Sequence, residues 1–473
     1  MDRETGDSGK LREGIPMSDK EQIQQEKREA RRRRRVRNQV VAYVVLVALI
    51  LAAAAGTVYG VNYLTKNSIG FGKGDGAGGA DDQQGGSEDQ DRQDAIDDIF
   101  GSEEAIPTPE PTPEPTPAVP EQTPEERLDE IVNVQIEGMP LEDKVAGLFI
   151  VTPETITGVG TAVQAGDGTR QALSEHPVGG LVYFKKNIQS EDQLRQMLTN
   201  TASYAEYPLF LAVDEEGGQV ARVGSSGIGP KVDGAGDIGA TGDAGNAYQA
   251  GVSIGSTLAG LGFNLDFAPV ADLANVEGSV MEGRSYGSEA GSVSGFVASM
   301  TSGLRDQGVA ACLKHFPGIG SSTKDTHEGM ASTDRTAEQF RAEEFAVFAA
   351  GINAGAEMVM VSHMAAPSLT GNNEPCIFSE ELVTGVLREE LAFDGVIITD
   401  AMNMAAISDY YGADEAAVMA VLAGCDMLLM PEDYEKAYNG ILAAIQEGHI
   451  SEERINDSLR RIYRIKFAGK IEE

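Results

Sequence analysis

The strongest constraint on the fold comes from eight short apolar runs that recur between longer stretches in residues 127–473. Each run is continuous in Val, Ile, Leu or Phe, which is typical of strands buried on both faces of a parallel sheet. Helical periodicity lies between several runs, as in residues 336–355. This alternation predicts an α/β fold, specifically a (β/α)8 TIM-type barrel, and a doubly wound open sheet is the alternative. The runs are 147–151, 178–184, 208–214, 263–269, 309–315, 356–362, 394–400 and 425–430.

Polar side chains lie at or just after the carboxyl ends of four of these predicted strands. In an α/β barrel those ends share one face, and active sites are built on it. Taken alone, Asp400 also suits a helix N-cap and Asp214 a turn. The recurrence of polar residues at the same end of several strands favours a polar pocket instead. The residues are Asp214, Lys314, His315, Ser362, His363 and Asp400.

The densest group of ionisable residues is KHFPGIGSSTKDTHEGM, residues 314–330. Gly318 and Gly320 would let the chain turn tightly beyond the strand end. Asp325 and His327 are close enough on a loop for a carboxylate–imidazole hydrogen bond, which would make His327 a general acid and base near neutral pH. A metal site formed by Asp325 and the two histidines fits no common zinc spacing, and a solvated polar loop is the structural alternative.

This segment resembles the pattern Lys-His-Phe/Ile-Pro-Gly-x-Gly-x4-Asp-Ser/Thr-His of family 3 glycoside hydrolases, in their β-N-acetylglucosaminidase branch. Other motifs occur in the order that the family has them, so the resemblance covers the whole globular part. They are DEEGGQVAR (214–222), NLDFAPVADL (264–273), GRSYGSEA (283–290) and ITDAMNM (398–404).

The resemblance implies roles for individual residues. Asp400 would be the nucleophile that forms a covalent glycosyl-enzyme, and His327 would be the acid/base, paired with Asp325 as a dyad. Retaining hydrolysis needs such a pair, although two carboxylates are more usual. The residues implied to hold the sugar hydroxyls are Asp214, Arg222, Arg284, Lys314 and His315. No metal and no cofactor is expected.

Two positions depart from the family pattern. Ile319 stands where many relatives carry His or Asn, and Ala331 where Pro is frequent. The barrel is followed only by a helix, predicted at 453–469, which favours N-acetylglucosaminides over glucosides as substrates. Trp is absent, so stacking on a sugar would need Tyr or Phe, such as Tyr286.

The N-terminal region predicts a single-pass membrane protein. Residues 40–61 contain no charged side chain, and six arginines lie directly before them. We therefore expect a cytoplasmic tail at 1–38, a transmembrane signal-anchor helix at 39–61 and an extracytoplasmic remainder at the cell membrane. A buried core helix is the alternative. Residues 62–126, rich in Gly and Asp and then in Pro, Thr and Glu, predict a disordered linker.

Charge and cysteine content limit the partners. With 37 Lys+Arg against 74 Asp+Glu, the net charge of −37 argues against nucleic-acid binding. Cys312, Cys376 and Cys425 are widely spaced, which predicts small buried thiols rather than disulfides or a zinc site. We expect a monomeric barrel.

Together these features predict an exo-β-N-acetylglucosaminidase that acts on GlcNAc-containing glycans or muropeptides from peptidoglycan. A β-N-acetylglucosaminide phosphorylase or a β-glucosidase of the same family is the enzymatic alternative. A non-catalytic barrel that binds the cell wall is the alternative from another class.

Overall fold

The computed structural model describes residues 122–326 and 329–470. The predicted cytoplasmic tail, the transmembrane helix and nearly all of the predicted linker lie outside these residues, and so does His327. Within the described ranges, no helix is long and apolar enough to cross a bilayer.

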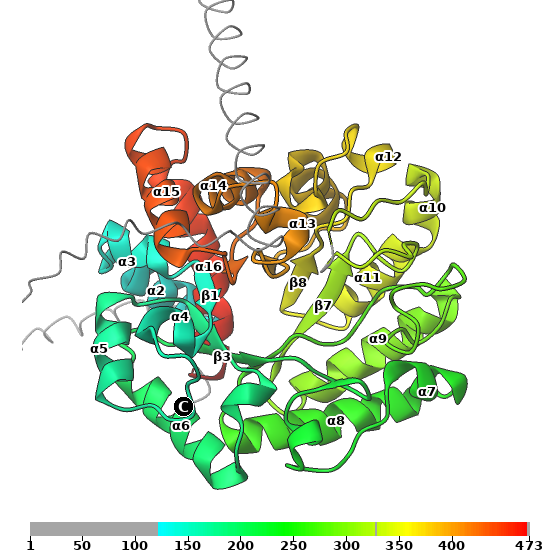
Figure 1. Ribbon diagram of the computed structural model, residues 1–473, viewed down its shortest axis with the longest axis horizontal. Coiled ribbons are helices and arrows are strands. Elements are labelled where there is room, and N and C mark those ends of the chain that lie inside the picture. The colour runs from blue at the N-terminus through cyan, green and yellow to red at the C-terminus, as the bar shows by residue number, and fades with distance from the viewer. Residues whose placement is uncertain (1–121, 327–328, 471–473) are drawn as a thin grey trace, which may run out of the picture. The chain divides into compact units, whose positions relative to one another are not determined.

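Eight parallel strands form a closed barrel, as predicted, with helices arranged around them (Figure 1). The neighbour order is β10-β1-β2-β3-β6-β7-β8-β9. The ring closes because Ile398 bridges Met427 at the entry to β10, which excludes an open sheet. The strands are β1 (Phe149–Val151), β2 (Gly180–Val182), β3 (Phe210–Val213), β6 (Leu265–Asp266), β7 (Ala310–Phe316), β8 (Met358–Val361), β9 (Val396–Thr399) and β10 (Leu428–Leu429).

Most helices lie between consecutive strands in the chain, whereas α2 and α3 precede β1 and α15 and α16 follow β10. Helices α8, α9 and α11 pack along one side of the barrel (Figure 1). They are α2 (Pro124–Glu137), α3 (Leu141–Ala146), α4 (Pro153–Thr157), α5 (Asp167–Glu175), α6 (Glu191–Tyr204), α7 (Ala235–Ala240), α8 (Ala244–Leu261), α9 (Ala290–Arg305), α10 (Ala337–Ala342), α11 (Glu344–Asn353), α12 (Pro367–Thr370), α13 (Ala405–Ser408), α14 (Ala413–Ala423), α15 (Tyr434–Gln446) and α16 (Glu452–Phe467). Four short 3-10 helices are η1 (Lys185–Asn187), η2 (Gly224–Ser226), η3 (Cys376–Phe378) and η5 (Ala468–Lys470), and a π-helix is η4 (Glu381–Glu390).

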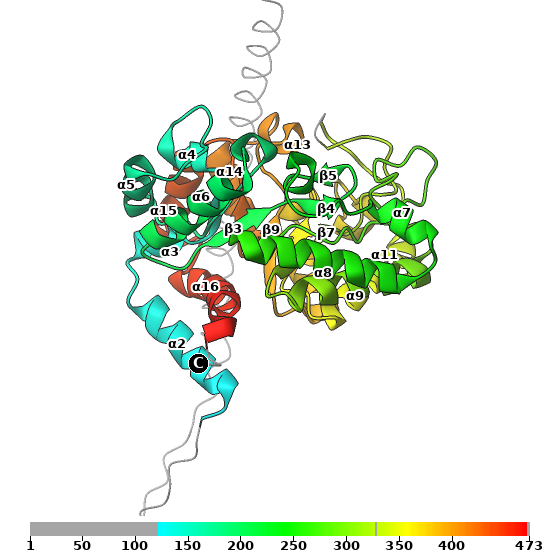
Figure 2. The ribbon, with the colours of Figure 1, turned by 90° about the horizontal axis from the view of Figure 1, so that it is seen from below.

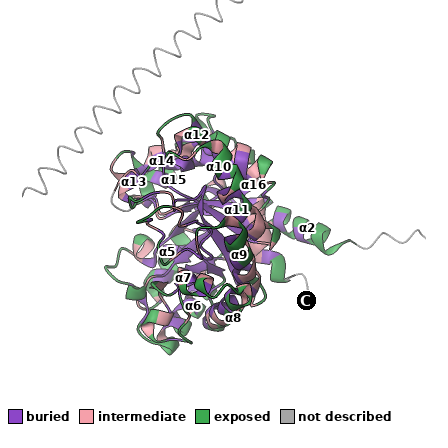
Figure 3. Ribbon diagram, turned by 90° about the vertical axis from the view of Figure 1, so that its right-hand side faces the viewer, coloured by how far each residue is buried: buried purple, intermediate pink, exposed green. Residues whose placement is uncertain are grey.

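The core follows from the apolar runs. Every residue of the eight barrel strands is buried, and Figure 3 shows burial concentrated in the strands and on the inner sides of the helices. This explains why the runs lack alternation, since both faces of each strand avoid water. The three cysteines are buried and free, as predicted.

The two ends of the barrel differ. In Figure 2 the hairpin of β4 (Glu215–Gly217) and β5 (Val220–Ala221) lies with α13 on one side of the sheet, and α16 lies with α2 on the other. The first side is the carboxyl end of the strands. Here the pairing of β7 with β8 shifts between Lys314 and Phe316, an irregularity of the kind that re-aims side chains next to active sites.

Each predicted strand contains an observed one, but three details differ from the sequence predictions. The predicted helix 336–355 divides into α10 and α11, because Glu343 has non-helical dihedrals (φ −121°, ψ −73°). The β4–β5 hairpin was not predicted. The helix α2 begins at Pro124, inside the predicted linker, because Thr123 and Glu126 form a capping box.

Candidate active site

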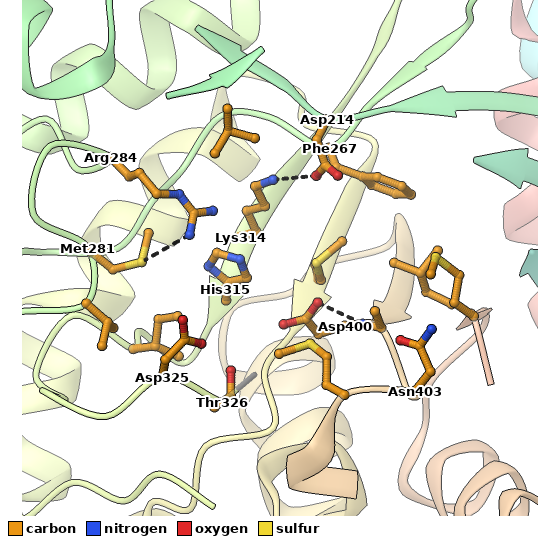
Figure 4. A pocket seen from close by; sticks show the side chains of 18 of the residues that line it. Asp214, Phe267, Met281, Arg284, Lys314, His315, Asp325, Thr326, Asp400 and Asn403 are labelled. Carbon is orange, nitrogen blue, oxygen red and sulfur yellow. Dashed lines mark hydrogen bonds and ion pairs between the residues drawn. The ribbon is translucent and has the colours of Figure 1, made fainter. Parts of the chain in front are cut away.

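A cavity of about 570 Å³ lies at the carboxyl ends of the strands (Figure 4). It brings together all the predicted site residues except His327, which lies outside the described residues. These residues lie between positions 214 and 400 and follow different strands, so the closed ring of strands is what places them side by side. The predicted residues that line the cavity are Asp214, Arg222, Arg284, Lys314, His315, Asp325 and Asp400.

Lys314 is the centre of an ion-pair network at the inner wall. Its Nζ lies 2.8 Å from Oδ1 of Asp214 and 2.7 Å from Oε1 of Glu216. Burial would lower the pKa of Lys314, but these two carboxylates outweigh it and raise the pKa above its ordinary value. The ammonium therefore stays charged, and it holds both carboxylates in place.

Glu216 joins this network to Arg284 and was missed by the sequence analysis. The guanidinium of Arg284 donates to both carboxylate oxygens of Glu216, from Nη2 at 2.7 Å and from Nε at 2.9 Å. Burial would raise the pKa of Glu216, yet the charges of Lys314 and Arg284 lower it to about 2. The segment DEEGG offered two candidate carboxylates, Glu215 and Glu216. The β4–β5 hairpin, which was not predicted, decides that Glu216 faces the site.

The neighbouring Glu215 has a structural role instead. Its carboxylate accepts hydrogen bonds from the backbone N–H groups of Val223 and Gly224, at 2.7 and 2.9 Å. These bonds tie the end of the β4–β5 hairpin to its start, and so fix the position of Arg222. The Nη2 atom of Arg222 lies 3.7 Å from Oδ2 of Asp214.

His315 is oriented by Asp272, the second residue that the sequence analysis missed. Nδ1 of the imidazole lies 2.7 Å from Oδ2 of Asp272, and Oδ1 of the same carboxylate accepts the backbone N–H of Ile319 at 2.7 Å. A carboxylate can only accept, so Nδ1 carries the hydrogen and Nε2 remains for a ligand. Asp272 lies at the end of the motif 264–273, where no predicted strand end drew attention to it.

Asp400 lies directly after β9 and lines the cavity. Its Oδ1 accepts the N–H of Ala401 at 2.7 Å, and the next helix, α13, has Met404 as its N-cap. The N-cap alternative for Asp400 is therefore wrong, because four residues separate it from the first turn of the helix.

The electrostatic surroundings of Asp400 suit a nucleophile. Burial would raise its pKa, but the charges of His363 and His315, the N–H of Ala401 and Lys314 outweigh burial and lower the pKa below its ordinary value. His363 is itself buried, and its Nε2 donates to the carbonyl oxygen of Ala401 at 2.9 Å. The carboxylate thus stays ionised at neutral pH, as a nucleophile requires.

The segment that follows β7 is fixed beside the active site by close backbone contacts. Gly318 has φ +122°, as its predicted tight turn requires. Gly320 serves another purpose, because a Cβ there would lie 1.7 Å from the carbonyl oxygen of Leu273. Further along, the carbonyl of Thr326 accepts the N–H of Ala406 at 3.3 Å, which ties this segment to the one that carries Asp400. Asp325 is exposed at the cavity.

The cavity lining also bears on the two departures from the family pattern, on the residue suggested for sugar stacking and on the metal-site alternative. Ile319 and Ala331, the departures from the family pattern, both line the cavity. Tyr286 was proposed for sugar stacking, but it is buried against Phe296, with ring centroids 5.4 Å apart, and does not line the cavity. The aromatic lining comes from Phe184 and Phe267 instead. Within the described ranges, no group of three or more His, Cys, Asp or Glu side chains could hold a metal ion.

The sequence of the barrel matches a known family. The model of the glycosyl hydrolase family 3 N-terminal domain matches residues 140–465. The chain is 35% identical over 284 residues to a β-hexosaminidase of Stenotrophomonas maltophilia, covering 58% of this chain and 82% of that one. It is also 30% identical over 332 residues to β-hexosaminidase A of Pseudoalteromonas piscicida, covering 63% of this chain. The match spans about half (54%) of the Pseudoalteromonas protein.

The fold agrees with this match. A structure of a family 3 β-N-acetylglucosaminidase from Paenibacillus superposes with a TM-score of 0.66 at 35% identity. The superposition covers 71% of this chain and 64% of the Paenibacillus chain. The resemblance predicted from the motifs is therefore confirmed, and the chain belongs to glycosyl hydrolase family 3, among relatives that are β-hexosaminidases.

Proposed function

We propose that the protein is a retaining exo-β-N-acetylglucosaminidase that removes terminal GlcNAc from peptidoglycan fragments. Asp400 attacks the anomeric carbon and forms a covalent glycosyl-enzyme. His327, assisted by Asp325, first protonates the leaving oxygen and then activates the water that releases the sugar. No metal or cofactor takes part in these steps.

The observation that carries this proposal is the position of Asp400 beside a wall of charged and polar side chains. Lys314, Arg284 and His315 offer donors, and Asp214 offers an acceptor, on one side of an ionised carboxylate. A sugar ring presents hydroxyl groups that both donate and accept, so such a wall would hold it with its anomeric carbon near Asp400. Exo action, the removal of a terminal sugar, is what the resemblance to the β-N-acetylglucosaminidase branch implies.

The relatives support the choice of sugar. Those named above are β-hexosaminidases, and the Paenibacillus structure is of a β-N-acetylglucosaminidase. The choice of peptidoglycan fragments as the source of the terminal GlcNAc rests on the N-terminal sequence. Six arginines followed by 22 uncharged residues would anchor the barrel at the outer side of the cell membrane, within reach of wall fragments.

The nucleophile is tested with 4-nitrophenyl β-N-acetylglucosaminide. We expect Asp400→Ala to lower kcat/KM by at least about 10³-fold, because the covalent step loses its nucleophile. Its melting temperature should stay within a few degrees of the wild-type value, which separates lost chemistry from lost folding. Equal activity of the two proteins would contradict the assignment of Asp400.

The same assay distinguishes the alternative functions. NMR of the first product formed should show the β-anomer, since two inversions give retention. Formation of GlcNAc-1-phosphate that depends on added phosphate would identify a phosphorylase. Higher kcat/KM on the 4-nitrophenyl β-glucoside would identify a glucosidase. Binding of muropeptides without any turnover would identify a wall-binding barrel.

A further inference from the structure

The charged wall of the active-site cavity is backed by a carboxyl group that the proposed mechanism does not use. Asp266 lies on β6, is fully buried and does not line the cavity. In the pairing of β6 with β3 its partner is Val213, so Asp266 lies beside the point where β3 ends and Asp214 follows. Burial of a carboxyl group is costly, so its contacts indicate what it contributes.

Asp266 holds the peptide group that joins Asp214 to Glu215. Its Oδ1 accepts the N–H of Glu215 at 2.9 Å, and the carbonyl oxygen of Asp214 accepts the N–H of Arg222 at 3.4 Å. Both polar groups of this one peptide are therefore bound. Because a peptide group is planar, these two bonds fix the direction in which the side chain of Asp214 leaves the backbone.

The position of Asp214 in turn determines what Lys314 can offer a sugar. Nζ of Lys314 lies 2.8 Å from Oδ1 of Asp214 (Figure 4) and 2.7 Å from Oε1 of Glu216. An ammonium group has three hydrogens, so these two acceptors leave one donor for a ligand in the cavity that Lys314 lines. A further carboxylate behind the wall would compete for that donor.

The surroundings of Asp266 favour the neutral acid. Its Oδ2 is buried and has no hydrogen-bond partner within the described ranges, where Lys314 pairs with Asp214 and Glu216 instead. An ionised carboxylate here would leave a charged oxygen without a donor. Burial, together with the charges of Glu215 and Asp214, raises the pKa of Asp266 well above its ordinary value, and outweighs the N–H of Glu215 and the charge of Lys314.

We propose that Asp266 is a positioning residue, held as the neutral acid, that fixes the charged wall from behind and leaves the third donor of Lys314 to the sugar. This inference rests on the proposed function, because it assumes that a sugar occupies the cavity. A neutral acid still offers Oδ1 to the N–H of Glu215, but it adds no charge that would draw Lys314 away from Asp214. Asparagine has the same shape and the same acceptor without a charge, so it can replace such a residue.

The first test compares Asp266→Asn with Asp266→Leu on 4-nitrophenyl β-N-acetylglucosaminide. Asp266→Asn should keep kcat/KM within about three-fold of the wild-type value, because the acceptor remains. Asp266→Leu should lower kcat/KM about 10- to 100-fold, because the N–H of Glu215 loses its acceptor and Asp214 is no longer fixed. Equal losses in the two variants would overturn the neutral acid, and wild-type activity in Asp266→Leu would overturn the positioning.

The neighbouring residue of β6 provides a matched control for lost stability. Leu265 is also fully buried, and its side chain faces the other side of the strand. Leu265→Ala should lower the melting temperature, but it should leave kcat/KM unchanged at temperatures where the variant is folded. A loss of activity equal to that of Asp266→Leu would show that any defect in β6 disturbs the site, and so would overturn a specific contribution of Asp266.

Infrared spectroscopy tests the charge of Asp266 without turnover. The difference spectrum between wild type and Asp266→Asn at neutral pH should contain the C=O band of a protonated carboxylic acid. The band of an ionised carboxylate in its place would overturn the proposal. This measurement does not depend on whether Asp266→Leu folds.

Calorimetric titration with GlcNAc separates this inference from the proposed function. Asp266→Leu should weaken binding of GlcNAc about ten-fold, whereas Asp266→Asn should bind it as the wild type does. Equal affinity of all three proteins would overturn the positioning. A wild type that binds GlcNAc in this way but hydrolyses no β-N-acetylglucosaminide would overturn only the proposed function. A wild type that does not bind GlcNAc would overturn both.

Discussion

Two clusters of buried charge lie at opposite ends of the barrel, and they are built differently. At the amino end, Asp426 is fully buried, and its carboxylate receives Arg388 at 2.6 Å, the N–H of Ile397 at 2.9 Å and Ser458 at 2.8 Å. Arg461 adds a fourth donor at 3.1 Å. All the donors come from the barrel or from helices packed against it, so this cluster closes on itself.

The cluster at the carboxyl end is left open. Lys314 and Glu216 are buried, as Asp426 is, but Asp214, Arg284 and Arg222 line the active-site cavity with 20–33% of their side chains exposed. The arginines around Asp426 are 15–29% exposed, but they do not line that cavity. The comparison teaches that burial of charge alone does not identify a site. A closed cluster binds one part of the protein to another, whereas an open cluster retains donors and acceptors for a ligand.

The largest effect that this comparison predicts concerns folding. Asp426→Asn should lower the free energy of unfolding by about 3–5 kcal/mol, because three half-buried arginines lose the buried carboxylate that they share. Urea denaturation measures this change. At temperatures where the variant remains folded, kcat/KM should equal the wild-type value. The exposed Asp394→Asn at the same end of the barrel serves as the control and should change stability by less than about 0.5 kcal/mol. Loss of activity in the folded Asp426 variant would break the comparison.

The second prediction concerns chemistry at the open end. Glu216→Gln should lower kcat/KM about 10²-fold, or about 2.7 kcal/mol, because Lys314 and Arg284 lose the carboxylate that positions them against the sugar. Its effect on unfolding should be smaller than that of Asp426→Asn. The adjacent Glu215→Gln is the matched control, and we expect it to retain activity within about ten-fold, since Glu215 bonds only backbone groups. If the two glutamines lower activity equally, the assignment of Glu216 to the site is wrong.

The smallest effect concerns a buried amine at the closed end. Nζ of Lys466 donates to the carbonyl of Gly179 at 2.8 Å and lies 4.7 Å from the ring centroid of Phe210. Burial lowers the pKa of Lys466 to about 7. The unfolded chain therefore binds the extra proton between about pH 7 and 10.5, so stability conferred by this residue rises with pH across that window.

Lys466→Met should remove this dependence. The difference in unfolding free energy between wild type and variant should shift in favour of the wild type as the pH rises from 7 to 10. Lys231→Met controls for the loss of one positive charge. The pH profile of kcat/KM should be the same in all three proteins, because the amine lies at the end of the barrel away from the cavity. A constant difference in stability across the pH range would show that Lys466 titrates normally.

Much of this architecture was predictable because it depends on local pattern. Eight continuous apolar runs give eight buried strands, and polar residues at their carboxyl ends must share a face once the strands are parallel. Asp400, Lys314 and His315 were found in this way. The resemblance to family 3 glycoside hydrolases added Arg222 and Arg284, whose place in the cavity no strand end reveals.

What sequence alone did not determine depends on contacts between distant segments. Glu216 faces Lys314 only because an unpredicted hairpin turns Glu215 toward its own backbone. Asp272 acts through His315, 43 residues further along the chain. Asp400 and Asp426 are both aspartates beside a strand, and their sequence contexts do not tell a site from a structural anchor. The ring of strands decides this, because it places one carboxylate at an open cavity and packs α16 over the other.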